Sequence, residues 1–225
     1  MRTFRQLAIA AAILTCVSAV VAPSSQAVTA PTNKAVEAAL VRLKLPSGPA
    51  DGVFDAQTQR GLCEWRELTG HRQSRALPSA TERVDIINTT KKIIPKYMVV
   101  GLNINRTCQA MTWIAVSPTT KLPLIYAVYP VSTGRPSFPT ATGLHTIYST
   151  VNRWQESTLY PGAMMYRPMY FHGGMAIHGS AADYLVRTYP DSHGCVRALH
   201  KDIDKMWASG VGRGTKVLVY GTYVF

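Results

Sequence analysis

The residues of this 225-residue chain best suited to chemistry are one cysteine and two histidines in its C-terminal half. Cys195 and His193 lie in the segment SHGCVR (192–197), and His178 lies in AIHGS (176–180). A thiol attacks a carbonyl only as its thiolate, so it needs a base or a positive charge beside it. We therefore expect Cys195 to be a nucleophile and His178 its base. His193 is the alternative base, or a residue that positions the substrate.

Two neighbours of the cysteine fit an attack on a carbonyl group. Gly194 permits a tight turn, so that main-chain N–H groups near Cys195 face an oxyanion. Arg197 supplies a fixed positive charge, which favours the thiolate or holds a substrate carboxylate. The segment therefore predicts cysteine-dependent chemistry on an acyl substrate.

The N-terminus predicts export. Arg2 and Arg5 precede an apolar run over residues 7–22, and small residues at Ser25 and Ala27 fit a peptidase site. We expect a signal peptide over residues 1–27, cleaved after Ala27, and a protein located outside the cytoplasm, in the cell wall or secreted. An uncleaved membrane anchor is disfavoured because the run is short and no stop-transfer flank follows.

The predicted export affects which cysteines we expect to form a disulfide. Removing Cys16 leaves Cys63, Cys108 and Cys195, and an exported protein oxidises the pairs that it can. We expect a Cys63–Cys108 disulfide and a free Cys195, because only Cys195 lies in a segment rich in histidine and glycine. The alternative is that Cys63 and Cys108 are two separate buried thiols.

Composition excludes several classes of protein. The chain is 47% hydrophobic and 9% aromatic, too much of each for a disordered protein. It carries 24 Lys and Arg against 12 Asp and Glu, a net charge of +12. No Lys/Arg cluster is interleaved with aromatic residues, so we expect no nucleic-acid partner. Attraction to an anionic wall or membrane surface fits the charge better.

The chain divides into two parts after a short tail at 28–33. Helical spacing over 34–45 and 55–69, with a third short helix at 81–87, predicts a small helical module over residues 34–90. From 96 to 225, runs rich in Val, Ile, Tyr and Trp predict strands. These runs are 97–105, 109–116, 122–131, 143–151 and 216–220, and a helix is expected over 199–209. The fold class predicted is a mainly β domain with a short helix, preceded by a small α-helical module.

Several motifs together resemble the L,D-transpeptidase catalytic domain, also called YkuD. That family has a histidine, a spacer of this length, then Ser/Thr-His-Gly-Cys, usually with an arginine or asparagine two residues later. His178, SHGC (192–195) and Arg197 match it. Upstream, YPVSTG (129–134) is similar to the family's strand and turn, and TATG (140–143) stands where it usually has Thr-Pro-Thr-Gly. The resemblance covers residues 96–221 and implies a β-sandwich with a short helix.

The resemblance also implies roles for individual residues. Cys195 would be the nucleophile and His178 its base, with the carbonyl of Gly179 orienting the imidazole ring. His193 and Gly194 would belong to the catalytic segment. Ser192 and Arg197 would shape the substrate and oxyanion site.

The resemblance further implies the reaction and its partners. The enzyme would acylate on a peptidoglycan tetrapeptide stem, release D-alanine and pass the acyl group to an amine, forming 3→3 cross-links. Transfer to water would make it an L,D-carboxypeptidase. It implies no metal and no organic cofactor, and carbapenem β-lactams as covalent inhibitors. The segment DGVFD (51–55) and Thr58 resemble a peptidoglycan-binding module.

Three other readings of the same residues stay open. Cys195, His178 and His193, with His172, are potential zinc ligands, although no fourth ligand lies at a familiar spacing and no H-E-x-x-H is present. A papain-like peptidase is disfavoured because it places its cysteine far before its histidine. The third reading is a non-catalytic peptidoglycan-binding protein in which Cys195 is only buried.

Overall fold

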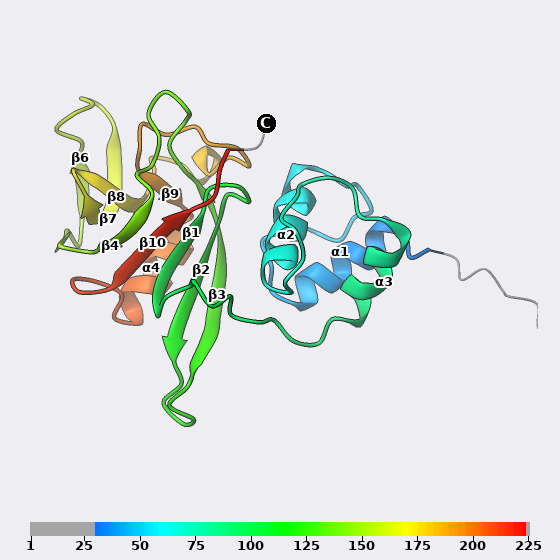
Figure 1. The fold of residues 1–225 in the computed structure, drawn as a ribbon. Coiled ribbons are helices and arrows are strands. Elements are labelled where there is room, and N and C mark those ends of the chain that lie inside the picture. The colour runs from blue at the N-terminus through cyan, green and yellow to red at the C-terminus, as the bar shows by residue number, and fades with distance from the viewer. Residues whose placement is uncertain (1–29, 224–225) are drawn as a thin grey trace, which may run out of the picture.

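Three short helices open the part of the chain that the computed structural model describes, residues 30–223 (Figure 1). They are α1 (Asn33–Arg42), α2 (Ala56–Glu67) and α3 (Ala80–Asn88). Each begins after a residue whose side-chain oxygen accepts a backbone N–H of the first turn, namely Thr32, Asp55 and Ser79. The predicted signal peptide over residues 1–27 lies outside the described residues.

The helices share a core that continues into the sheet. Leu40 of α1, Trp65 of α2 and Ile86 of α3 are fully or almost fully buried in one cluster. The same cluster includes Met98 from the connecting segment and Ile114 from a strand. The helices are therefore packed against the β domain rather than tethered to it.

The rest of the described chain forms one curled sheet of ten strands, in the order β4-β10-β1-β2-β3-β9-β8-β7-β5, with β6 beside β7. The strands are β1 (Gly101–Asn105), β2 (Ala110–Val116), β3 (Pro123–Ser132), β4 (Gly143–Thr146), β5 (Ser149–Thr150), β6 (Trp154–Glu156), β7 (Met164–His172), β8 (Met175–Gly179), β9 (Val196–Ala198) and β10 (Lys216–Tyr220). A 3₁₀ turn, η1 (Asp183–Leu185), and one helix, α4 (His200–Ala208), complete the domain.

Strand β3 is the corner at which the sheet curls. Residues 123–130 of β3 pair with β2, whereas Val131 and Ser132 pair with β9. The apolar faces of the two halves meet in one core, to which Leu102, Ile177 and Ile203 of α4 contribute. The predicted fold class, a mainly β domain with a short helix after a few helices, is confirmed.

The sequence patterns missed the strands between residues 154 and 198. Four residues of β8 are buried, so this strand shows no alternation of apolar and polar side chains. Strand β9 has only three residues and β7 has an interrupted register with β8, which leaves little periodic signal. The predicted strand over 97–105 begins only at Gly101.

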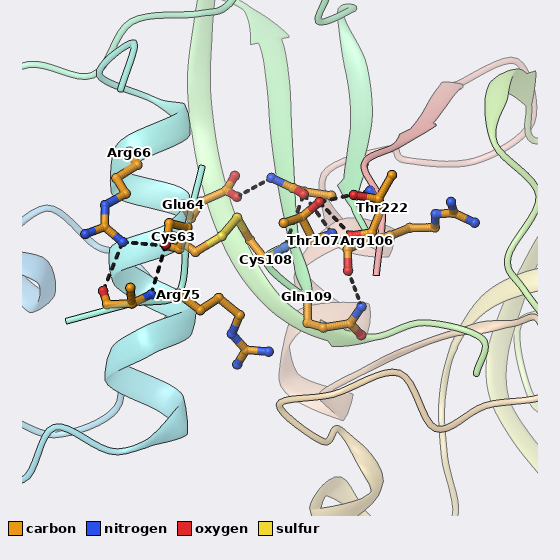
Figure 2. Close-up of a disulfide and its surroundings, with 12 residues drawn as sticks. Cys63, Glu64, Arg66, Arg75, Arg106, Thr107, Cys108, Gln109 and Thr222 are labelled. Carbon is orange, nitrogen blue, oxygen red and sulfur yellow. Dashed lines mark hydrogen bonds between the residues drawn. A yellow bond between two sulfur atoms is a disulfide. The ribbon is translucent and has the colours of Figure 1, made fainter. Parts of the chain in front are cut away.

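A disulfide links the helices to the sheet, as predicted. Cys63 of α2 and Cys108 of the β1–β2 turn are bonded, with their Cα atoms 5.3 Å apart (Figure 2). Both cysteines are fully buried, and Cys195 is the free cysteine of residues 30–223. The bond fixes α2 on one end of the β1–β2 pair.

A buried carboxylate lies next to this disulfide. Glu64 accepts hydrogen bonds from Asn105 Nδ2 at 3.2 Å and Thr112 Oγ1 at 2.5 Å. Burial raises the pKa of Glu64 to about 7, against the effect of these two donors. Its hydrogen bonds make a second polar attachment of α2 to β1 and β2.

Among the helices of residues 30–223, none has both the length and the apolar character needed to cross a bilayer.

Removal of the disulfide tests its contribution to stability. We expect Cys63→Ser/Cys108→Ser to lower the free energy of unfolding by about 2–4 kcal/mol, because the cross-link closes a long loop in the unfolded chain. Urea unfolding measures the change. As a control, a reductant should destabilise the unsubstituted protein and leave the double variant unaffected. Equal stability of the two proteins would contradict the prediction.

Candidate active site

Two adjacent parallel strands bring the predicted nucleophile and base together. In the β8–β9 register, His178 lies beside Arg197 and Ile177 beside Val196. One residue earlier, the N–H of Ala176 donates to Sγ of Cys195 at 3.4 Å. Because side chains alternate along a strand, His178 and Cys195 lie on the same face. Both line a cavity of about 240 Å³.

The tautomer of His178 follows from its partner. Nδ1 lies 2.7 Å from the carbonyl oxygen of Gly179, which can only accept a hydrogen bond. Nδ1 therefore carries the proton and donates it, and Nε2 keeps a free lone pair. A neutral imidazole in this orientation is able to take a proton from a thiol.

Burial keeps both groups neutral in the free protein. It lowers the pKa of His178 to about 4, with a further lowering by the charge of Arg197. Burial raises the pKa of the Cys195 thiol above its ordinary value, although the Ala176 N–H and Arg197 oppose the shift. The resting site is therefore a thiol beside a neutral imidazole.

The turn that carries Cys195 is closed by Ser192. The Ser192 hydroxyl donates to the carbonyl of Cys195 and accepts from the N–H of Gly194 at 3.2 Å. Gly194 has φ of +110°, which residues with a side chain rarely adopt. The hydroxyl and the glycine together set the direction in which the thiol points.

Residues 133–140 support this turn through hydrogen bonds to its backbone. Thr140 Oγ1 donates to the carbonyl of Gly194 at 2.9 Å and accepts from the N–H of Gly134 at 2.8 Å. The carbonyl of Thr133 accepts from the N–H of Ser192 at 3.1 Å. A Cβ at Gly134 would collide with backbone atoms of Phe138 and Gly194. The segments 129–134 and 140–143 therefore position the cysteine turn.

His193 and Arg197 occupy different places around the cavity. His193 is exposed at its rim, where Nε2 accepts from Arg135 at 2.6 Å, so this nitrogen is occupied. Its ring lies 4.5 Å from that of Tyr160. Arg197 is mostly buried and pairs with Asp191 at 3.1 Å. Of the two histidines, His178 has the geometry of a base for Cys195, and His193 is an exposed residue of the cavity lining.

His200 is a supporting residue that the sequence patterns did not single out. Its Nε2 lies 2.7 Å from the carbonyl of Ser180, to which it donates. A Cβ on Gly179 would collide with the His200 ring, so only glycine fits there. His200 thus supports the segment whose carbonyl orients His178. Nothing in the linear sequence pairs these residues, since η1 and the cysteine turn separate them.

The cavity has other lining residues that the sequence patterns missed. The Ser180 hydroxyl is buried there without a hydrogen-bond partner in residues 30–223. Tyr160, Met165 and Leu185 supply apolar surface. His172 instead lies beside His145, with ring centroids 4.7 Å apart, and does not line this cavity. Across the described part of the chain, no three His, Cys, Asp or Glu side chains are grouped as metal ligands would be.

The neutral thiol and imidazole predict a pH profile. Below the thiol pKa the thiolate fraction rises with pH, so alkylation of Cys195 by iodoacetamide should accelerate about tenfold per pH unit from pH 6 to 8. Mass spectrometry of the Cys195 peptide gives the rate. His178→Gln should keep the same slope, because His178 is neutral above about pH 5. A plateau from pH 5 to 8 that disappears in the variant would instead indicate a preformed thiolate–imidazolium pair.

Comparisons with known proteins bear on the family of the β domain. Residues 104–219, just over half of the chain, match the family described as the L,D-transpeptidase catalytic domain (YkuD). A search of curated proteins finds no match.

Two solved structures are similar in fold. An L,D-transpeptidase from Xylanimonas cellulosilytica is 24% identical, with a TM-score of 0.57, covering 84% of this chain and 93% of that one. An L,D-transpeptidase from Stackebrandtia nassauensis is 18% identical, with a TM-score of 0.50, covering 85% of this chain and 91% of that one. With the family match over the β domain, these findings place this chain in the L,D-transpeptidase (YkuD) family.

Proposed function

We propose that this protein is an exported L,D-transpeptidase that uses Cys195 as its nucleophile and forms 3→3 cross-links between peptidoglycan stems. The observation that carries the proposal is the position of Cys195 and His178 on one cavity, with Nε2 of His178 free to accept a proton. Membership of the family supplies the substrate class.

The first half-reaction is acylation of the thiol. Nε2 of His178 takes the thiol proton, and Sγ attacks the carbonyl that joins an L-centre of the stem to the terminal D-alanine. The tetrahedral intermediate then expels the D-alanine amine, which takes the proton back from His178. The products are free D-alanine and a thioester on Cys195.

The second half-reaction transfers the acyl group. The side-chain amine of another stem attacks the thioester, His178 takes the proton that the amine loses, and Sγ leaves and is reprotonated. A new amide bond forms and the free thiol returns. Attack by water would give a shortened stem, the L,D-carboxypeptidase outcome that is the alternative function.

The remaining site residues have roles that follow from their places. Ser192 holds the turn at Gly194 by accepting the Gly194 N–H, and the other main-chain N–H groups of this turn would face the developing oxyanion. Arg197 attracts a carboxylate of the stem, with Asp191 setting its orientation. Gly179 fixes the imidazole tautomer. His193, at the rim, contacts the entering substrate.

Location and the helical module complete the proposal. The N-terminal pattern supports export by a signal peptide ending at Ala27, after which the enzyme works outside the cytoplasm in the cell wall. The disulfide between Cys63 and Cys108 is consistent with an oxidising location. We assign residues 34–90 to a peptidoglycan-binding-like module and 96–225 to the catalytic domain.

Product analysis tests the reaction. Incubation with a disaccharide-tetrapeptide should give a cross-linked dimer with loss of D-alanine, detected by mass spectrometry, and Cys195→Ala should give none. Tripeptide without dimer would support the carboxypeptidase instead. Unchanged substrate would contradict both enzymes and favour a binding protein.

A pair of matched histidine variants tests the base. His178→Gln should slow acylation by about 10²–10⁴-fold, because general-base catalysis is lost. His172→Gln, which changes a histidine outside the cavity, should stay within about threefold of the unsubstituted enzyme. Acylation is followed by release of D-alanine. Similar rates for the two variants would show that His178 is not the base.

Inhibition gives an independent readout of the nucleophile. The family resemblance implies that a carbapenem acylates Cys195. Mass spectrometry of the intact protein should therefore show one added carbapenem, absent from Cys195→Ala. An adduct of equal yield in that variant would place the reactive group elsewhere.

A further inference from the structure

A second and larger cavity, of about 950 Å³, lies between the helices and the β domain. Residues of α2 and the segment before it form one wall, and β3, α4 and the segment 183–189 form the others. We call this cavity the interdomain cleft. The disulfide and the Glu64 hydrogen bonds hold the two parts of the protein in place on either side of it.

The interdomain cleft is strongly cationic. Its lining includes two carboxylates, and both are engaged: Asp183 accepts from the N–H of His200 at 2.9 Å, and Asp202 is buried 3.9 Å from Lys205. The lining also includes six cationic residues, Lys44, Arg60, Lys92, Arg187, Lys201 and Lys205, of which Arg187 lies 4.0 Å from Asp191 outside the lining. An unpaired excess of positive charge within walls of low dielectric attracts anions.

One of these cations is built into the wall. Arg60 is only 3% exposed, and its Nη2 donates to the carbonyl of Arg187 at 2.5 Å. Its Nε has no acceptor in residues 30–223. Arg75 lies close by and donates to the carbonyl of Thr188 at 2.7 Å. Burial, and then the charge of Arg75, lowers the pKa of Arg60 to about 9. A buried guanidinium with an unused Nε–H beside another cation is stabilised when an anion binds, although Asp55 already offsets part of the Arg60 charge.

Tyrosine side chains give the cleft flat apolar surfaces. Tyr126, Tyr184 and Tyr189 line it and are 58%, 70% and 50% exposed. The Tyr129 hydroxyl is buried without a partner in the described residues, and burial raises its pKa to about 12, so it remains a donor. Exposed aromatic faces pack against the apolar faces of sugar rings, while the hydroxyls meet their polar edges.

We propose that the interdomain cleft binds an acidic oligosaccharide, whose negative groups pair with its lysines and arginines and whose sugar rings lie on its tyrosines. The charge alone would suit any anion, and the tyrosines alone any flat ligand. Their combination in one cleft of this volume favours an extended ligand with both features.

The cleft and the reactive cavity share one wall. In the segment after β8, Ala181 and Leu185 line the cavity of Cys195, whereas Tyr184 and Arg187 line the interdomain cleft. A glycan held in the cleft would therefore lie directly behind the reactive cavity. The binding itself does not depend on the reaction at Cys195 and is measured without the thiol.

Isothermal titration of Cys195→Ala protein with three peptide-free probes tests the proposal. The probes are a neutral N-acetylglucosamine tetramer, an N-acetylglucosamine–N-acetylmuramic acid tetrasaccharide, which bears carboxylates, and an N-acetylglucosamine tetramer that bears phosphate groups. At least one acidic probe should bind at least tenfold more tightly than the neutral tetramer, and more weakly as salt rises from 50 to 200 mM. Which acidic probe binds identifies the source of the charge, carboxylate or phosphate.

Matched charge variants locate the binding. Lys44 and Lys201 are exposed on opposite walls of the cleft, so Lys44→Gln/Lys201→Gln should fold normally and bind the acidic probe at least fivefold more weakly. The control is Lys121→Gln/Arg213→Gln, which removes the same charge from exposed positions outside the cleft. Lys121 also matches Lys44 in backbone, with φ of 60° against 56°.

Three results would overturn the proposal: equal binding of neutral and acidic probes, equal effects of the two double variants, or no binding of any probe. Each is distinct from a failure of the proposed reaction. Cross-linking is scored by its products, whereas these titrations use a protein that cannot form a thioester.

Discussion

Strands β8 and β9 run parallel, and the register between them controls the chemistry of the site. It places Arg197 beside His178 and sets Cys195 next to Ala176, on the face from which the imidazole projects. A shift of one residue would turn the thiol and the imidazole to opposite faces of the sheet. The register is stabilised because Ile177 and Val196, which lie between the functional side chains, are fully buried in the core, and a shift would expose them.

Hydrogen bonds to main-chain groups then fix the orientation of the His178 ring and of the turn that carries Cys195. The carbonyl of Gly179 selects the tautomer of His178, and Thr140 and Ser192 hold the Cys195 turn through its backbone. Burial has a different effect, because it favours the neutral forms of both the thiol and the imidazole. The backbone around Cys195 and His178 is thus ordered in the free protein, and both side chains are neutral there.

The helices and the β domain behave as one folded unit. A continuous apolar cluster, the Cys63–Cys108 disulfide and the buried Glu64 all cross the boundary between them. The contact also buries polar groups, Glu64 and Arg60 among them, and this burial raises the pKa of Glu64 and lowers that of Arg60. These attachments hold the helices against the β domain, and the interdomain cleft is the space that remains between the two parts.

The sequence by itself determined the elements with strong local signals, and it singled out Cys195 and His178, which the structure brings to one cavity. Asp55 begins a helix because its side chain caps the first turn, and Cys195 stands in a segment rich in histidine and glycine that drew attention to it. Which histidine faces the thiol was decided by strand pairing, and the support from His200 and Thr140 by contacts between residues far apart in the chain. Buried strands such as β8 lack a periodic pattern, and the interdomain cleft joins cations from both parts of the protein. Only the tertiary structure reveals such features, because distance in space is not encoded by spacing along the chain.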